Sequence, residues 1–172
     1  MKIKSKNIIE KRNTLNKEIT KYWAIIRQEN IMSKAAIEAG MGSGFDLKAL
    51  YNCIKQKAEM RIKTKLYLQA LNMGYTDFSE FKKDTNYENI YTLNEKKEQL
   101  VQLGMINCLN PAYKSKKGKK LTTIETFSKE KLSNLKNELQ LEINSLEKKI
   151  EDFNNNTELE ISEKDNMLFT IA

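Results

Sequence analysis

Apolar side chains recur at steps of three and four residues through three long stretches of this chain, and polar residues fill the positions between them. The repeats are Ile8, Leu15, Ile19, Tyr22 and Ile26 in the first stretch, Leu50, Ile54, Ala58, Ile62, Leu66 and Ala70 in the second, and Leu132, Leu135, Leu139, Ile143, Leu146, Ile150 and Phe153 in the third. Such spacing places the apolar side chains on one face of an α-helix. We therefore predict amphipathic helices over residues 1–39, 46–73 and 128–156.

The third of these helices needs a long partner. At about 1.5 Å per residue it extends for about 40 Å, so only another long helix can cover its apolar stripe. Residues 1–75 carry a net charge of +9 and residues 128–172 a net charge of -4, which favours packing of the third helix on the first two. The predicted fold is mainly α, with three long amphipathic helices in a coiled-coil-like bundle.

Smaller elements are predicted between the second and third helices. Thr92-Leu-Asn-Glu95 has the spacing of a capping box, so we expect a short brace helix over residues 92–103. Apolar and β-branched runs at residues 105–109 and 121–127 predict a small β-hairpin with a basic loop, spanning residues 105–127. Residues 1–160 are then one helical domain. Residues 161–172 form an apolar tail that we expect to dock as a strand or to contact a neighbouring subunit.

Composition narrows the classes of function. The chain of 172 residues has no His and only two Cys, so a zinc site and a disulfide framework are not expected. No carboxylates are paired at metal-ligand spacing on one apolar face. We therefore predict a protein that is not an enzyme and that binds no metal or cofactor. No apolar run reaches the roughly 20 residues that cross a bilayer, and no secretory signal is recognisable, so no membrane and a cytoplasmic location are expected.

Arginine is rare in this basic chain, because only three of its 30 Lys and Arg residues are Arg. Arg12 lies on the apolar stripe of the first predicted helix. Its stem can pack there while the guanidinium reaches the edge of the bundle or a Glu. Alternatively, its planar fork can grip an anion in an interior pocket. In this second interpretation, helical hairpins form a symmetric oligomer whose pockets between subunits collect Arg12, Arg27 or Arg61 with the rings of Tyr22 and Trp23.

A second candidate site lies in the basic loop. Its residues are Tyr113, Lys114, Lys116, Lys117, Lys119 and Lys120. The lysines can hold phosphates while the tyrosine stacks on a base. The same composition is also typical of a solvated loop tip.

Several short sequences mark the chain between these helices. They are Glu10-Lys-Arg12, Thr92-Leu93, Tyr113-Lys-Ser115, Thr122-Thr-Ile124, Asn154-Asn-Asn156 and Thr157-Glu-Leu159. With the helices around them, they give about residues 8–160 a layout that resembles the septicolysin family of small bacterial and phage proteins. The resemblance implies a helical, oligomeric fold, and it transfers no catalytic residue to this chain.

The net charge of +7 and the unpaired apolar stripes predict a non-enzymatic homo-oligomer that binds a small anionic ligand such as a nucleotide. Phage proteins that sequester host nucleotide signals, and so inhibit host defence, fit this description by analogy. Two alternatives stay open. The protein is a regulator or inhibitor that binds nucleic acid or a nucleoprotein, or it is a structural coiled-coil scaffold without a ligand.

Overall fold

Helices make up most of the molecule. The computed structural model describes residues 3–33, 38, 40, 44–109 and 123–158. The helices are α1 (Ser5–Glu29), α3 (Leu47–Asn72), α4 (Phe78–Asp84), α5 (Tyr87–Gly104) and α6 (Lys129–Asn156), and the strands are β1 (Ile31–Ser33) and β2 (Thr123–Glu125). The prediction of a mainly α fold is confirmed. The ends of α3 and α6 lie within one residue of those expected from the apolar repeats.

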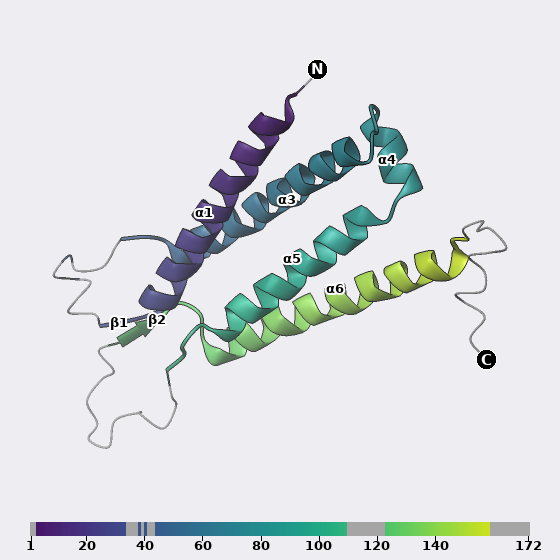
Figure 1. Cartoon of the computed structure of the whole chain (residues 1–172). Coiled ribbons are helices and arrows are strands. Elements are labelled where there is room, and N and C mark those ends of the chain that lie inside the picture. The colour runs from purple at the N-terminus through teal and green to yellow at the C-terminus, as the bar shows by residue number, and fades with distance from the viewer. Residues whose placement is uncertain (1–2, 34–37, 39, 41–43, 110–122, 159–172) are drawn as a thin grey trace, which may run out of the picture.

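Four of the helices form two antiparallel pairs, α1 with α3 and α5 with α6 (Figure 1). Lys57 Nζ of α3 lies 2.7 Å from Glu18 Oε2 of α1. Lys97 Nζ of α5 lies 2.7 Å from Glu147 Oε1 of α6. The two pairs meet where α3 packs on α5. The prediction that the third long helix packs on the first two is therefore wrong for most of its length, and only its first half, with Leu132, reaches the core shared with α1 and α3.

Helix α5 is longer than the predicted brace, and the capping-box interpretation of its start is wrong. The helix begins at Tyr87, five residues before Thr92. Thr92 Oγ1 donates a hydrogen bond of 2.6 Å to the carbonyl of Glu88 one turn back, and Glu95 is buried. A Thr inside a helix commonly makes this bond to the preceding turn. The sequence from Thr92 to Glu95 is therefore compatible with a helix interior as well as with a helix start. The extra length is what lets α5 pair with α6.

The first helix ends ten residues earlier than predicted, at Glu29. The next residue, Asn30, is 1% exposed and ties three segments together. Its Nδ2 donates to the carbonyls of Asn107 and Phe127, and its Oδ1 accepts from the amide of Phe127 at 2.7 Å. These bonds hold the chain in a non-helical path, and the following residues form β1. The apolar residues after Asn30 continue the helical repeat, which is why periodicity did not mark this end.

The predicted β-hairpin within residues 105–127 is also wrong. Strand β2 pairs antiparallel with β1, with Met32 opposite Ile124, and residues 105–109 form no strand. Ile106 is buried in the core instead, and the amide of Leu109 donates to Glu125 Oε1 at 2.7 Å. Residues 105–109 are thus an irregular segment that buries Ile106 and bonds the amide of Leu109. Strand β2 pairs with β1, which is distant in the sequence.

Local capping follows the sequence closely. The side chain of Asp46 accepts from the amides of Lys48 and Ala49 at the start of α3, and that of Asp77 accepts from Ser79 at the start of α4. Gly74, after the end of α3, has a φ of 81°, in the left-handed region that favours glycine. With the amide of Gly74 bonded to Leu71 and that of Tyr75 bonded to Ala70, this end is a Schellman motif.

Two cores stabilise opposite ends of the molecule. The larger lies near the β strands and contains Trp23, Tyr51 and Phe127, all buried. The smaller lies at α4, where Phe81 is fully buried and stacks on Phe78 and Tyr87. The basic loop and residues 161–172, for which we predicted a ligand site and a tail, lie outside the described residues.

Candidate anion-binding site

A groove lies between the first half of α3 and the start of α6. Its volume is about 250 Å³, and it is lined by Lys48, Tyr51, Asn52, Lys55, Phe127, Lys131 and Leu135. The four residues from α3 share one helix face because they are spaced by three and four positions. Lys131 lies in the first turn of α6, where the side chain of Ser128 caps the helix by accepting from its amide. We call this surface the basic groove.

The floor of the basic groove is aromatic. Tyr51 is 7% exposed and Phe127 is 1% exposed, and their ring centroids lie 5.9 Å apart in an edge arrangement. Lys55 Nζ lies 5.3 Å from the centroid of Tyr51, and Lys131 Nζ lies 4.9 Å from that of Phe127. Because ring faces attract cations, the two adjacent rings hold two ammonium groups at the same surface.

The lysines of the basic groove have no ion pair in the part of the chain that the structure describes. Among the described residues, no Asp or Glu forms an ion pair with Lys48, Lys55 or Lys131. Burial, and then the charge of Lys48, lowers the pKa of Lys131 below its usual value of 10.5. Both effects disfavour a charged ammonium. An anion in the groove would offset the repulsion between the two ammonium groups.

Negative charge lies nearby but does not enter the groove as a salt bridge. Burial raises the pKa of Tyr51 above 10.0, and Glu138 and Glu142 of α6 raise it further. Both glutamates are exposed, and Glu142 pairs with Lys96 of α5 at 2.5 Å. Glu142 therefore contributes to the contact of α6 with α5 and forms no ion pair with the lysines of the groove.

Arg61, one of the arginines predicted to hold an anion, is occupied within the fold. Its Nε and Nη2 donate to the two carboxylate oxygens of Glu95 at 2.8 and 2.6 Å, and Nη2 also donates to Glu98 at 2.7 Å. Its Nη1 donates to Asn16 Oδ1 at 3.2 Å. Burial alone would lower the pKa of Arg61, but the two carboxylates outweigh burial and raise it. A guanidinium already shared by two glutamates has no free fork for a ligand.

The other predicted pocket residues are spread along α1. Arg27 donates to the side-chain amide oxygen of Gln102. Arg12 is half-buried, and at 15 residues from Arg27 it lies about 22 Å away along the helix. Tyr22 is half-buried under Lys57, whose Nζ lies 5.7 Å from the ring centroid. Within one chain the three arginines are not brought together.

Trp23, another predicted residue, contacts the floor of the basic groove. It is 2% exposed and packs edge-on against Tyr51, with 5.9 Å between centroids. It therefore supports the aromatic floor from behind and does not face a ligand. Tyr113, Lys114, Lys116, Lys117, Lys119 and Lys120 lie outside the described residues, so their predicted role stays a prediction.

The sequence held a signal for the basic groove that periodicity of apolar residues did not reveal. Lys48, Tyr51 and Lys55 are spaced by three and four positions, and Phe127 and Lys131 by four. Each set shares a helix face or its flank, with an aromatic ring beside an ammonium group. What the sequence does not contain is the approach of α6 to α3, which completes the groove.

Comparison with known proteins adds no assignment. The chain matches no protein-family model, no curated protein and no solved structure. Its resemblance to the septicolysin family therefore stays a prediction. No helix in the described part of the chain is long and apolar enough to cross a membrane. Within the same residues, no three His, Cys, Asp or Glu side chains are grouped so that they could hold a metal ion.

Proposed function

We propose that this protein is a non-enzymatic binder of a small anionic ligand such as a nucleotide, and that the basic groove binds its phosphate groups. The observation that carries the proposal is the convergence of Lys48, Lys55 and Lys131 without a carboxylate partner among the described residues. Holding like charges together at a partly buried site costs free energy. A bound phosphate would offset that cost and would form charge-assisted hydrogen bonds with the ammonium groups.

The size of the basic groove supports a small anionic group. Its volume of about 250 Å³ is below the range of about 300–1,000 Å³ that is common for sites enclosing a drug-sized ligand. Phosphate groups fit this volume, and the rest of a nucleotide would extend beyond it. The side chain of Asn52 adds an amide that can donate a hydrogen bond to a phosphate oxygen.

The side chains near the groove favour binding over catalysis. The chain has no His to act as a general base. Cys108 lies close to Phe127, with its Sγ 3.7 Å from the carbonyl of Phe127. Burial raises the pKa of this thiol, and Glu125 raises it further. Since the thiolate is the nucleophile, Cys108 is a poor candidate for covalent chemistry.

We infer in addition that the chains associate into a homo-oligomer with coiled-coil-like contacts between long helices, as members of a septicolysin-like group. In that assembly the arginine pocket between subunits, with Arg12 and Arg27, would be a second place for the ligand. A phage-type protein that sequesters host nucleotide signals is the role that this proposal favours. Native mass spectrometry over a range of protein concentrations tests it, because a single monomeric species throughout would contradict the oligomer.

Binding of inorganic pyrophosphate and of ADP, measured by isothermal titration calorimetry, tests the basic groove. Lys131→Gln should weaken pyrophosphate binding about tenfold, which corresponds to about 1.4 kcal/mol. Lys63→Gln is the matched control. Lys63 is exposed on α3, about 12 Å beyond Lys55 and outside the groove. At that distance its charge is screened at physiological ionic strength. Equal affinities for both variants, or no binding by the unaltered protein, would contradict the proposal.

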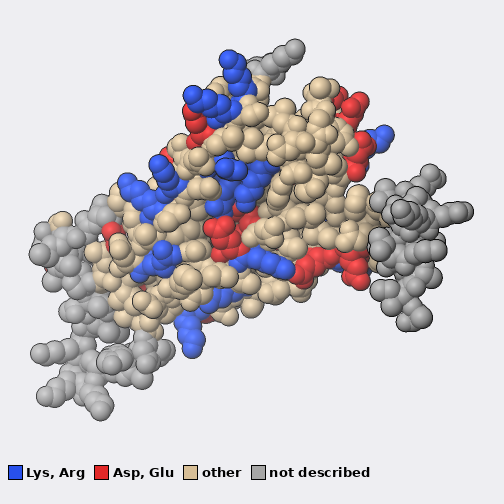
Figure 2. Space-filling view, viewed as in Figure 1, with Lys and Arg blue, Asp and Glu red and all other residues tan. Residues whose placement is uncertain are grey.

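A second candidate function is nucleic-acid binding, favoured by the charge of the first helical pair. Helices α1 and α3 each contain six Lys or Arg, against three Glu in α1 and one in α3. In Figure 2, Lys and Arg spread over α1 and the middle of the face shown, where a group of Asp and Glu also lies, and further Asp and Glu gather toward α4 and the far end of α6. This alternative predicts affinity for DNA or RNA that falls steeply with salt. A protein that binds neither pyrophosphate nor nucleic acid would favour the scaffold alternative.

A further inference from the structure

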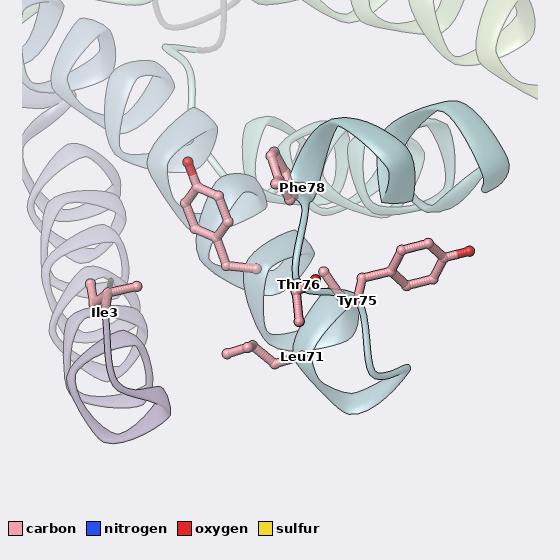
Figure 3. Close-up of a pocket in the computed structure, with 7 residues that line it drawn as sticks. Ile3, Leu71, Tyr75, Thr76 and Phe78 are labelled. Atoms are coloured by element: carbon pink, nitrogen blue, oxygen red, sulfur yellow. The ribbon is translucent and has the colours of Figure 1, made fainter. Parts of the chain in front are cut away.

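An apolar cavity lies at the end of the molecule away from the basic groove. Its volume is about 400 Å³, and its lining residues are Ile3, Tyr67, Ala70, Leu71, Tyr75, Thr76 and Phe78. In Figure 3, Ile3, on the segment that leads into α1, lies across from Leu71 in the last turn of α3. Ile3 is 56% exposed and Leu71 is 44% exposed. Apolar side chains exposed around a cavity are typical of a surface that another group covers.

The walls of this cavity are packed from behind, so it does not close by collapse. The ring of Phe78 lies 4.5 Å from that of Tyr67 and stacks on Phe81, with 5.8 Å between centroids. Phe81 is fully buried, and Ala70 beneath the cavity is 5% exposed. The ring of Phe78 is thus packed between the rings of Tyr67 and Phe81, which fixes the wall of the cavity at the end of α3.

We propose that residues 167–171 of the same chain, Met-Leu-Phe-Thr-Ile, occupy this cavity. These residues carry four large apolar side chains in a row of five positions. An apolar cavity with aromatic walls suits such side chains, because burial removes apolar surface of both partners from water. The smaller core at α4 would then continue into the cavity without a break.

The end of α6 lies at the correct end of the molecule for this contact. Helix α6 runs antiparallel to α5, with Lys97 paired to Glu147, so its last turn lies near the first turn of α5. There Tyr87 stacks on Phe81, and Phe81 stacks on Phe78 of the cavity wall. Figure 1 likewise places the end of α6 and the turn from α3 into α4 at the same end. Residues 158–166 would span about 30 Å if extended.

Charge favours the same path. Residues 158–165 contain Glu158, Glu160, Glu163 and Asp165 against a single Lys164, a net charge of -3. Lys4 and Lys6 follow Ile3 closely in the sequence, and both are exposed, although Lys6 also lies 4.0 Å from Glu10. An acidic connecting segment that approaches these lysines is attracted to them, although the attraction between exposed charges is weak.

Photo-crosslinking in the full chain tests this contact. A benzophenone amino acid replaces Leu71 in the cavity, and in a control protein it replaces Val101, which is 55% exposed on α5 outside the cavity. After irradiation and trypsin digestion, the Leu71 position should be joined mainly to the fragment that begins at Asp165. The Val101 position should give that product at least fivefold less often. Phe169→Asp puts a charge into the apolar segment, and it should reduce the cross-link from position 71 to that fragment by at least fivefold.

A mixture of ¹⁴N- and ¹⁵N-labelled protein separates contacts within a chain from contacts between chains. The proposal requires that the two halves of the cross-linked product carry the same isotope. Mixed-isotope products would overturn it and would identify a second copy of the chain as the occupant. Cross-links from position 71 to any other segment, or a yield that Phe169→Asp leaves unchanged, would overturn it as well.

Discussion

The buried ion pair between Arg61 and Glu95 allows the sharpest test of how the two helical pairs are joined. Arg61 on α3 is 6% exposed and Glu95 on α5 is 2% exposed. Glu95→Leu removes two charge-assisted hydrogen bonds and leaves the guanidinium partly buried. Removing one partner of such a pair usually costs about 3–5 kcal/mol of unfolding free energy. Arg61 keeps Glu98, at 2.7 Å, and Asn16, so we expect a cost near about 3 kcal/mol, the lower end of that range.

Urea denaturation followed by far-ultraviolet circular dichroism measures this cost. A second substitution, which removes the other charge, separates the cost of an unpaired charge from the cost of the lost contacts. In the double variant Arg61→Met with Glu95→Leu, no buried charge is left, so its unfolding free energy should return to within about 1 kcal/mol of the unaltered protein. Glu98, whose side chain is 45% exposed, would then be solvated by water. The exposed pair of Lys97 and Glu147 provides the control, since Lys97→Ala should cost less than about 1 kcal/mol.

Two results would refute this reasoning. A cost below about 1 kcal/mol for Glu95→Leu would mean that Arg61 is hydrated or fully satisfied without Glu95. A double variant as unstable as the sum of its single variants would mean that the two residues act independently. Either result would remove the ion pair as the reason why α5 packs on α3.

Three further predictions concern single positions. Asn30→Ala should lower the unfolding free energy by about 2–4 kcal/mol, because it leaves the amide of Phe127 without its acceptor; chemical denaturation measures the loss, and a cost under about 1 kcal/mol would contradict it. Gly74→Ala should lower the unfolding free energy by about 1 kcal/mol, because its φ of 81° is strained for alanine. Gly104→Ala is the control and should cost nothing measurable, since no atom lies within 4 Å of an added Cβ there. Equal effects of the two substitutions would contradict the role of the left-handed conformation at Gly74. Pyrophosphate should raise the lowered pKa of Lys131, which ¹⁵N NMR of the side chain measures. Since the ammonium is charged only below its pKa, the affinity for pyrophosphate should fall as pH rises toward 10.5, which calorimetry measures. An affinity that does not change from neutral pH upward would count against anion binding in the groove.

Long periodic stretches were predictable here because a buried helix face leaves a regular mark in the sequence. Leu132, Leu139 and Ile143 are all buried in α6 at the positions that the repeat required. The ends of elements were less predictable. Asn30 stops α1 through bonds to residues 107 and 127, and nothing in residues 20–40 alone shows that those partners exist. The boundary is a tertiary effect that local sequence does not encode.

The pairing of Arg61 was not predictable for the same reason. Sequence alone predicts Arg61 in a pocket between subunits, and no local pattern shows that a carboxylate pairs with it. Its partner Glu95 lies 34 positions away in the sequence and is predicted to be part of a capping box. The ion pair forms only because α3 packs on α5, and the local sequence around either residue does not show that contact.

Lysines are so common in this chain that their presence alone identifies no site. Many of them serve the fold: Lys57, Lys96 and Lys97 each pair with a Glu across a helix contact. Lys131 differs because it is partly buried beside Lys48, and no carboxylate of the described residues compensates its charge. The ring of Phe127, whose centroid lies 4.9 Å from Lys131 Nζ, stabilises the ammonium group there but leaves its charge uncompensated by an anion. The position of Lys131 beside Lys48 is therefore the reason why Lys131→Gln is the variant that tests the proposed anion binding most directly.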